Sequence, residues 1–118
     1  NLNTLNKFNI NIIINVTNEL DNYFNSSFIY YKLDVLDEKN AEISKYFNQF
    51  LNILKLHRDK NILVHCFMGS SRSAVLILLY LIKEKNISYD KALKFLKEKR
   101  DVVNINNFFL LQLKNYIN

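Results

Sequence analysis

One stretch near the middle of the chain places an apolar strand, a tight loop and an apolar helix in direct succession. Asn61–His65 ("NILVH") predicts a central strand covered on both faces. Ser73–Lys85 is apolar nearly all round and predicts a buried helix. The loop between them, "CFMGSSR", holds the only glycine and the only cysteine of a 118-residue chain that has no proline. A chain built around this unit has to bury both flanking elements and expose the loop at their junction.

This order of elements predicts an anion-binding loop. The first amides of a helix have no internal partner, and the helix dipole adds partial positive charge at that end. A loop that curls its N–H groups inward needs a residue that tolerates positive φ and close backbone approach, and Gly69 fills that position. We therefore expect the loop to bind phosphate through residues Phe67, Met68, Gly69, Ser70, Ser71 and Arg72.

Two side chains of the loop carry the expected chemistry. Arg72 is notable because most of the 16 basic residues are lysines, so an arginine here indicates planar, bidentate recognition of phosphate oxygens. Cys66 lies between a helix N-terminus and a cation, which favours a thiolate nucleophile. Ser73 is placed to hydrogen-bond the sulfur and to help it leave in a second step. A nucleophilic pair with His65 is disfavoured, because adjacent residues of a strand point to opposite faces.

The remaining pattern predicts an α/β domain with a largely parallel sheet, because strands alternate with helices. We expect a short helix ending near residue 8, an amphipathic helix from about residue 41 to 58, and a helix capped by Ser88. The other expected elements are strands at Ile12–Val16 and Phe28–Leu33, the strand and helix described above, and a last helix at Asn106–Tyr116.

Composition limits the alternatives. The length suits a single domain spanning 1–118, and the net charge of +5 favours acidic partners or simply a lysine-rich solvated surface. One cysteine excludes an internal disulfide, and one cysteine with two histidines gives no zinc spacing. The longest apolar run, Ala74–Ile82, is too short for a membrane span, and no signal peptide is visible.

The loop also carries a family resemblance. "HCFMGSSRS" resembles the His-Cys-x5-Arg-Ser/Thr signature of protein tyrosine phosphatases, in the form found in the dual-specificity branch. The segments "INVTNE", "NILVHC", "SRSAVLILLYLI" and "NNFFLLQLKNY" are similar to the corresponding dual-specificity segments. The resemblance implies a protein-tyrosine-phosphatase-like fold with a central, mostly parallel β-sheet flanked by helices. The family's first strand and turn have no counterpart in the chain, so the sheet is expected to be one strand short.

The resemblance also implies roles for residues outside the loop. An aspartate protonates the leaving group and then activates water; Asp37 takes that position, with Asp34 as the alternative. His65 corresponds to a histidine that fixes the loop by hydrogen bonding. Asn106 corresponds to an asparagine that buttresses the loop, although it could be a simple helix cap, and Gln112 is its companion on the last helix.

The function implied is a protein phosphatase that hydrolyses phosphotyrosine and phosphoserine/phosphothreonine through a phosphocysteine intermediate. The alternatives are a phosphopeptide-binding pseudophosphatase, or a phosphatase for RNA 5′-phosphates or phosphoinositides. We expect no cofactor, no metal, no nucleic-acid partner and no membrane association. The expected state is a monomer acting on phosphorylated proteins in the cytoplasm or nucleus, where thiols stay reduced. His57 is expected to be an ordinary surface residue.

Overall fold

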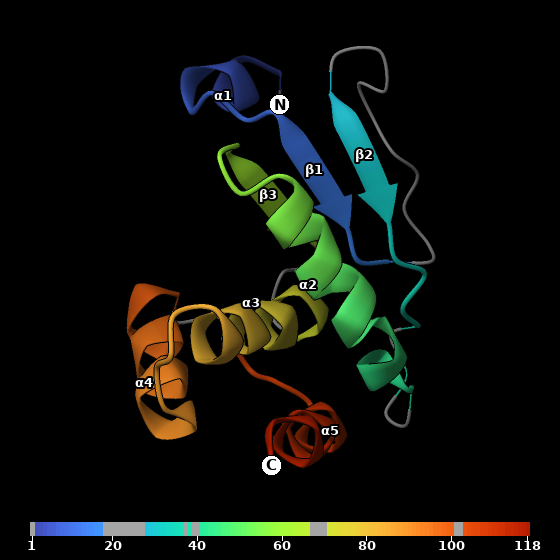
Figure 1. Ribbon diagram of the computed structural model, residues 1–118, viewed down its shortest axis with the longest axis vertical. Coiled ribbons are helices and arrows are strands. Elements are labelled where there is room, and N and C mark those ends of the chain that lie inside the picture. Colours follow the sequence, from blue (N-terminus) through green and yellow to red (C-terminus); the bar gives the residue numbers. More distant parts are fainter. Residues whose placement is uncertain (1, 18–27, 37, 39–40, 67–70, 101–102) are drawn as a thin grey trace.

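The computed structural model describes residues 2–17, 28–36, 38, 41–66, 71–100 and 103–118. Within these ranges three strands form a parallel sheet in the order β2-β1-β3 (Figure 1). The strands are β1 (Ile12–Asn15), β2 (Ile29–Lys32) and β3 (Ile62–His65). The helices are α1 (Leu2–Lys7), the 3-10 helix η1 (Ile43–Tyr46), α2 (Phe47–Leu56), α3 (Arg72–Lys83), α4 (Tyr89–Lys99) and α5 (Asn107–Ile117).

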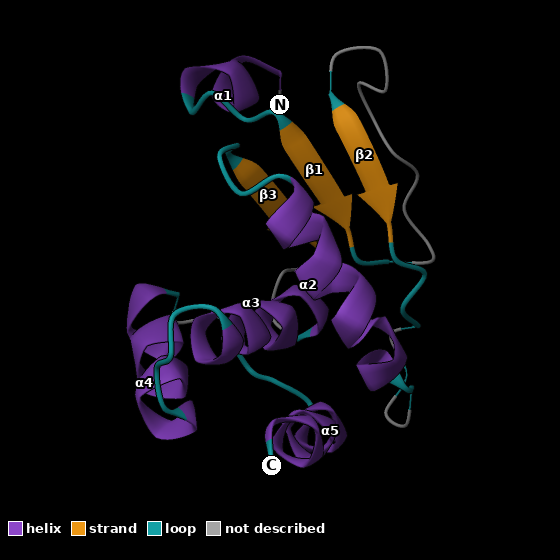
Figure 2. Cartoon of the chain, viewed as in Figure 1, coloured by secondary structure: helices purple, strands orange, loops and turns teal. Residues whose placement is uncertain are grey.

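Three helices, α3, α4 and α5, lie beyond one end of the sheet, whereas α1 lies at the other end (Figure 1). The arrows of β1 and β2 point toward the half of the molecule that holds α3, α4 and α5 (Figure 2). Helix α3 is the centre of that half, since it contacts α2, α4, α5 and β3. Ligands of open α/β sheets bind beyond the carboxyl ends of the strands. The topology therefore brings the loop that follows β3 to the end of the sheet where a ligand site is expected.

The central strand is β1, and this corrects the prediction made for β3. All four residues of β1 are buried, whereas those of β3 are only half-buried. β1 pairs with β2 on one side and β3 on the other, so that Ile13 lies opposite both Tyr30 and Leu63. The run of isoleucines suits this place, because β-branched side chains pack well on a pleated surface with neighbours on both sides.

The expected helices are present, with shifted ends. Helix α3 starts at Arg72 and buries eight of its twelve residues, which confirms the predicted buried helix. Ser88 caps α4 by accepting a hydrogen bond from the Lys91 N–H at 3.3 Å. The helix expected from residue 41 begins later, as the short 3-10 helix η1, and its N-cap residue Glu42 makes no side-chain cap. Across the described residues, no helix is both long and apolar enough to cross a membrane.

Asparagine takes the place of glycine where α3 ends. Asn86 adopts a φ of 56°, in the left-handed region that is usually left to glycine. The following Ile87 N–H donates to the Leu81 carbonyl at 3.1 Å, which closes the helix end. Since asparagine tolerates this conformation better than other residues with a Cβ, a chain with one glycine can still stop a helix cleanly.

Candidate active site

The nucleophile candidate lies at the junction of β3 and α3. β3 ends at His65, Cys66 follows directly, and α3 begins at Arg72. Cys66 is a free, buried cysteine that is 8% exposed. Four of the residues expected to bind phosphate, 67–70, lie outside the described residues, so their role stays a prediction. The described part of the junction has the geometry of a strand leading into a helix N-terminus, which is the arrangement that binds anions.

The Cys66 sulfur has two contacts from one residue of α3. The backbone N–H of Ser73 donates to Sγ at 3.3 Å, and the Ser73 hydroxyl oxygen lies 3.3 Å from the same sulfur. Ser73 itself is buried. The sulfur accepts in the first contact and the thiol donates to the hydroxyl oxygen in the second, so both contacts hold Cys66 against the first turn of α3.

Arg72 is held inside the molecule. Its side chain is 1% exposed and is among the largest fully buried side chains of the described residues. Nη1 donates to the carbonyl oxygen of Val35 at 3.0 Å. Val35 follows β2, so this bond ties the first residue of α3 to the segment that continues toward Asp37. A permanent cation at a helix N-terminus adds to the field that attracts an anion.

The end of the loop is tied to α5. The backbone N–H of Asn106 donates to Ser71 Oγ at 3.0 Å. The Asn106 side-chain oxygen accepts from the N–H groups of Phe108 and Phe109, at 2.7 and 3.4 Å. The Asn106 side chain therefore caps α5, and its backbone N–H supports Ser71.

The two candidate acids differ in what the structure describes. Asp34 is exposed and forms a 3.7 Å ion pair with Lys32. Its backbone carbonyl accepts from the Tyr46 hydroxyl at 3.3 Å. Asp37 lies outside the described residues, and its assignment stays a prediction. On either side of Asp37 in the sequence, the Val35 carbonyl accepts from Arg72 and the Ala41 carbonyl accepts from Gln112.

Gln112 joins α5 to the segment before α2. It is buried, and its Oε1 accepts from the Ser44 N–H at 2.9 Å while its Nε2 donates to the Ala41 carbonyl at 2.9 Å. Residues 67–70 of the loop lie outside the described residues, so the expectation that Gln112 is a companion of Asn106 in supporting the loop stays a prediction.

Burial affects the protonation of the His65 ring. The ring is half-buried at the end of β3, where the register pairs His65 with the fully buried Asn15. Among the described residues, no hydrogen bond to the His65 ring is present, so the loop-fixing role is not visible there. Burial lowers the pKa of His65 below its ordinary value of 6.5. The folded domain therefore favours the neutral ring.

We expect His65 to make the domain less stable in mild acid. Above pH 6.5 the ring is neutral in both states; as the pH falls below that value, the unfolded chain gains a proton that the folded chain resists. The midpoint of urea unfolding should thus decrease between about pH 7.5 and 5.5, and a His65→Gln variant should lose less stability over that interval. Equal losses in both proteins would contradict the assignment.

His57 is more than a surface residue, which corrects a second expectation. Its Nε2 lies 2.8 Å from the Tyr31 hydroxyl, and the two rings are tilted with centroids 5.6 Å apart. The contact fastens the end of α2 to β2.

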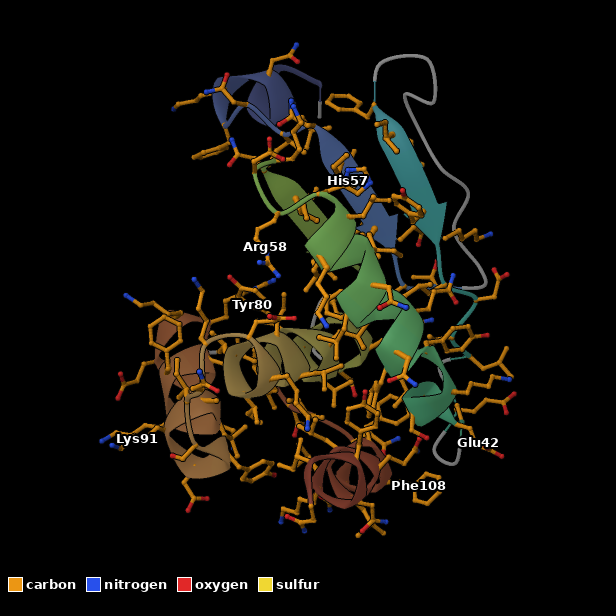
Figure 3. The ribbon with its side chains drawn as sticks, in the orientation of Figure 1. Glu42, His57, Arg58, Tyr80, Lys91 and Phe108 are labelled. Carbon is orange, nitrogen blue, oxygen red and sulfur yellow. The ribbon has the colours of Figure 1, made fainter. Side chains whose placement is uncertain are left out.

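A cavity among the described residues has a volume of about 660 Å³, and neither Cys66 nor Arg72 lines it. Its lining comes from α2, β3 and α3, Tyr80 among them, and from Arg58, which follows α2. Figure 3 shows these two side chains on the α2 and α3 sides of that region. The lining includes Asn61 and Ile62 at the amino end of β3, whereas Cys66 follows its carboxyl end. The cavity therefore belongs to the opposite end of the strand.

Comparison with known proteins agrees with this geometry. The model of the family "Dual specificity phosphatase, catalytic domain" matches residues 1–118. The chain is 38% identical over 119 residues to the Protein phosphatase Slingshot homolog of Xenopus laevis, covering 98% of this chain and 17% of that protein. It is 39% identical over 119 residues to human Protein phosphatase Slingshot homolog 2, covering 98% of this chain and 8% of that protein.

The fold agrees as well. The crystal structure of DUSP15 superimposes with a TM-score of 0.91 at 26% sequence identity, covering 98% of this chain and 75% of that one. The chain belongs to the dual specificity phosphatase catalytic domain family, and its fold is protein-tyrosine-phosphatase-like. Both the family and the fold class are as predicted from the sequence. The chain spans less than a fifth of the length of the two Slingshot relatives.

Proposed function

We propose that this domain is a protein phosphatase that hydrolyses phosphotyrosine and phosphoserine/phosphothreonine through a phosphocysteine intermediate. The observation that carries the proposal is the setting of Cys66. Its sulfur accepts a hydrogen bond from the Ser73 N–H and lies 3.3 Å from the Ser73 hydroxyl oxygen, at the start of α3. The buried Arg72 is the residue before Ser73. Membership in the family supports the same activity. The other phosphoryl substrates considered above have no feature of the described residues in their favour.

In the first step the Cys66 thiolate attacks the phosphorus atom of the substrate. The S–P bond forms as the P–O bond to the leaving tyrosine, serine or threonine oxygen breaks. Asp37, as a carboxylic acid, gives its proton to that oxygen, so no alkoxide or phenoxide leaves unprotonated. Arg72 and the loop amides stabilise the charge on the three equatorial oxygens of the transferring group.

In the second step water replaces the sulfur. Asp37, now a carboxylate, takes a proton from the attacking water as the new P–O bond forms and the S–P bond breaks. Cys66 leaves as a thiolate, and the Ser73 hydroxyl 3.3 Å away donates a hydrogen bond to it. Inorganic phosphate is released and the thiolate is restored. Each step needs a reduced cysteine, which the cytoplasm and nucleus maintain, and the domain is proposed to act there as a monomer on phosphorylated proteins.

The proposal is tested with a small aryl phosphate and orthovanadate. Vanadate adopts the trigonal-bipyramidal geometry of the transferring phosphoryl group and should inhibit competitively. Release of phosphate that vanadate suppresses is the expected result, followed by release from phosphotyrosine and phosphothreonine peptides. A folded domain that binds phosphate but releases none from any substrate would favour the phosphopeptide-binding alternative.

We expect Asp37→Asn to slow the reaction far more than Asp34→Asn. A general acid contributes roughly 10²–10⁴-fold, and the loss should be greatest with a phenol that is a poor leaving group. Asp34→Asn is the matched control, since it makes the same chemical change at an exposed side chain three residues earlier. The measurement is kcat/KM for both variants on aryl phosphates with a good and a poor leaving group. A greater loss from Asp34→Asn would transfer the acid role to that residue.

A further inference from the structure

We propose that Gln112 is a positioning residue for the general acid. The inference rests on the proposed function, with Asp37 as the acid. Gln112 lies on α5, far along the chain from Asp37, and its hydrogen bonds among the described residues are with neither Cys66 nor Arg72. They hold Ala41 and Ser44, where the chain enters η1.

The contacts of Gln112 use both ends of its amide. Oε1 accepts from the Ser44 N–H and Nε2 donates to the Ala41 carbonyl, each at 2.9 Å. Gln112 is 9% exposed, and the two residues that it bonds, Ala41 and Ser44, are half-buried. Because one end of the amide accepts a hydrogen bond and the other end donates one, Gln112 fixes both the position and the direction of the segment that holds Ala41 and Ser44.

The start of η1 explains why this support is needed. The first N–H groups of a helix require outside partners, and the N-cap residue Glu42 provides no side-chain bond. Gln112 Oε1 satisfies Ser44 N–H from another element instead. Figure 3 shows Glu42 and Phe108, at the starts of η1 and α5, on the same side of the molecule, and the two elements are in contact.

The other end of the acid segment is also fixed. The Val35 carbonyl accepts from Arg72 Nη1, and the Asp34 carbonyl accepts from the Tyr46 hydroxyl. Asp37 therefore lies in the sequence between two anchored points, Val35 and Ala41. The first anchor is the phosphate-binding arginine itself and the second is Gln112. Shifting the second anchor should move the acid relative to the leaving oxygen while Arg72 and Cys66 stay in place.

α5 contacts both parts of the site through different residues. At its start, Asn106 supports Ser71 next to Arg72, and two turns later Gln112 holds Ala41. One rigid helix thus spans the distance between the phosphate loop and the acid segment. Removing the Gln112 amide while keeping its volume would release the acid side and leave the loop side attached.

The test is Gln112→Met, which keeps the length of the side chain and removes both hydrogen bonds. We expect kcat/KM, which reports the step that releases the phenol, to decrease on the order of 10-fold for an aryl phosphate with a poor leaving group and by less than about twofold for one with a strongly acidic phenol. Vanadate inhibition should be nearly unchanged. Gln112→Glu retains an acceptor for Ser44 and should lose less activity than Gln112→Met.

A double-mutant cycle with Asp37→Asn decides whether the effect passes through the acid. In the Asp37→Asn background, Gln112→Met should have almost no further effect on kcat/KM for either leaving group. Leu113→Val is the matched control: it removes buried packing from the neighbouring position on α5, and any loss should be the same for both leaving groups.

Three outcomes separate the inference from the function on which it rests. A Gln112→Met loss that is equal for both leaving groups, or that adds fully to Asp37→Asn, would overturn the positioning role and leave the phosphatase intact. Absence of turnover in the parental domain would overturn both. A leaving-group-dependent loss that disappears in the Asp37→Asn background is the expected result.

Discussion

Replacing Cys66 with serine should abolish turnover and leave phosphate binding in place. A serine hydroxyl at this position is a far weaker nucleophile than a thiolate, and the loss of kcat should be at least about 10⁴-fold. The binding groups remain, because Arg72 is anchored by Val35 and the Ser73 N–H still points at the position of the sulfur. The measurements are phosphate release and, in parallel, calorimetric binding of phosphate.

The fold of the Cys66→Ser variant is checked by its unfolding temperature, because the residue is buried against the start of α3. A folded variant that turns over at the parental rate would exclude a covalent intermediate on Cys66. A folded variant that loses phosphate binding as well would mean that the sulfur, and not the surrounding donors, provides the binding free energy.

Arg72→Lys should have the second-largest effect, on both binding and catalysis. Lysine keeps the charge but has a single ammonium group, so it cannot donate to Val35 and make a planar, bidentate contact with phosphate together. Loss of one such group from a phosphoryl-transfer site costs roughly 10³-fold in kcat. Phosphate affinity should decrease too, in contrast to the result for Cys66→Ser.

The chain supplies matched controls for this variant. Arg58→Lys and Arg100→Lys make the same change at the two other arginines, both of which are exposed. Their kcat values should stay within about twofold of the parental value, as surface substitutions have small effects. Near-parental kinetics for Arg72→Lys itself would show that positive charge alone is sufficient at this position.

Most elements could be predicted from hydrophobic pattern, but the order of the strands could not. β1 and β3 are both short apolar runs, and periodicity does not distinguish a central strand from its neighbour. Their order depends on how α2 and the connections cross the sheet, which is a property of the whole chain. The prediction that β3 is central was therefore wrong, although its existence and limits were correct to within a residue.

At the site, contacts between neighbours in sequence were predictable and distant ones were not. The Ser73 contact with Cys66 follows from the way a helix begins after a loop, so the residue types in this short stretch were enough to predict it. The Gln112 contacts join residues 68 and 71 positions apart, and nothing in the local sequence names Ser44 or Ala41 as partners. The late start of the helix near Glu42 was not predicted for the same reason: the Ser44 N–H bonds the side chain of Gln112 on α5, which is distant in sequence.

The parallel sheet also has a consequence for how the domain folds. Ile12 pairs with Ile62 and Ile29, and each pairing joins segments that are well separated along the chain. The entropy of closing these loops has to be lost before the paired strands gain any stabilisation, so folding is slow compared with that of a helical bundle of equal size. The rate at which β3 reaches β1 thus limits how quickly a newly made chain can assemble the junction that holds Cys66.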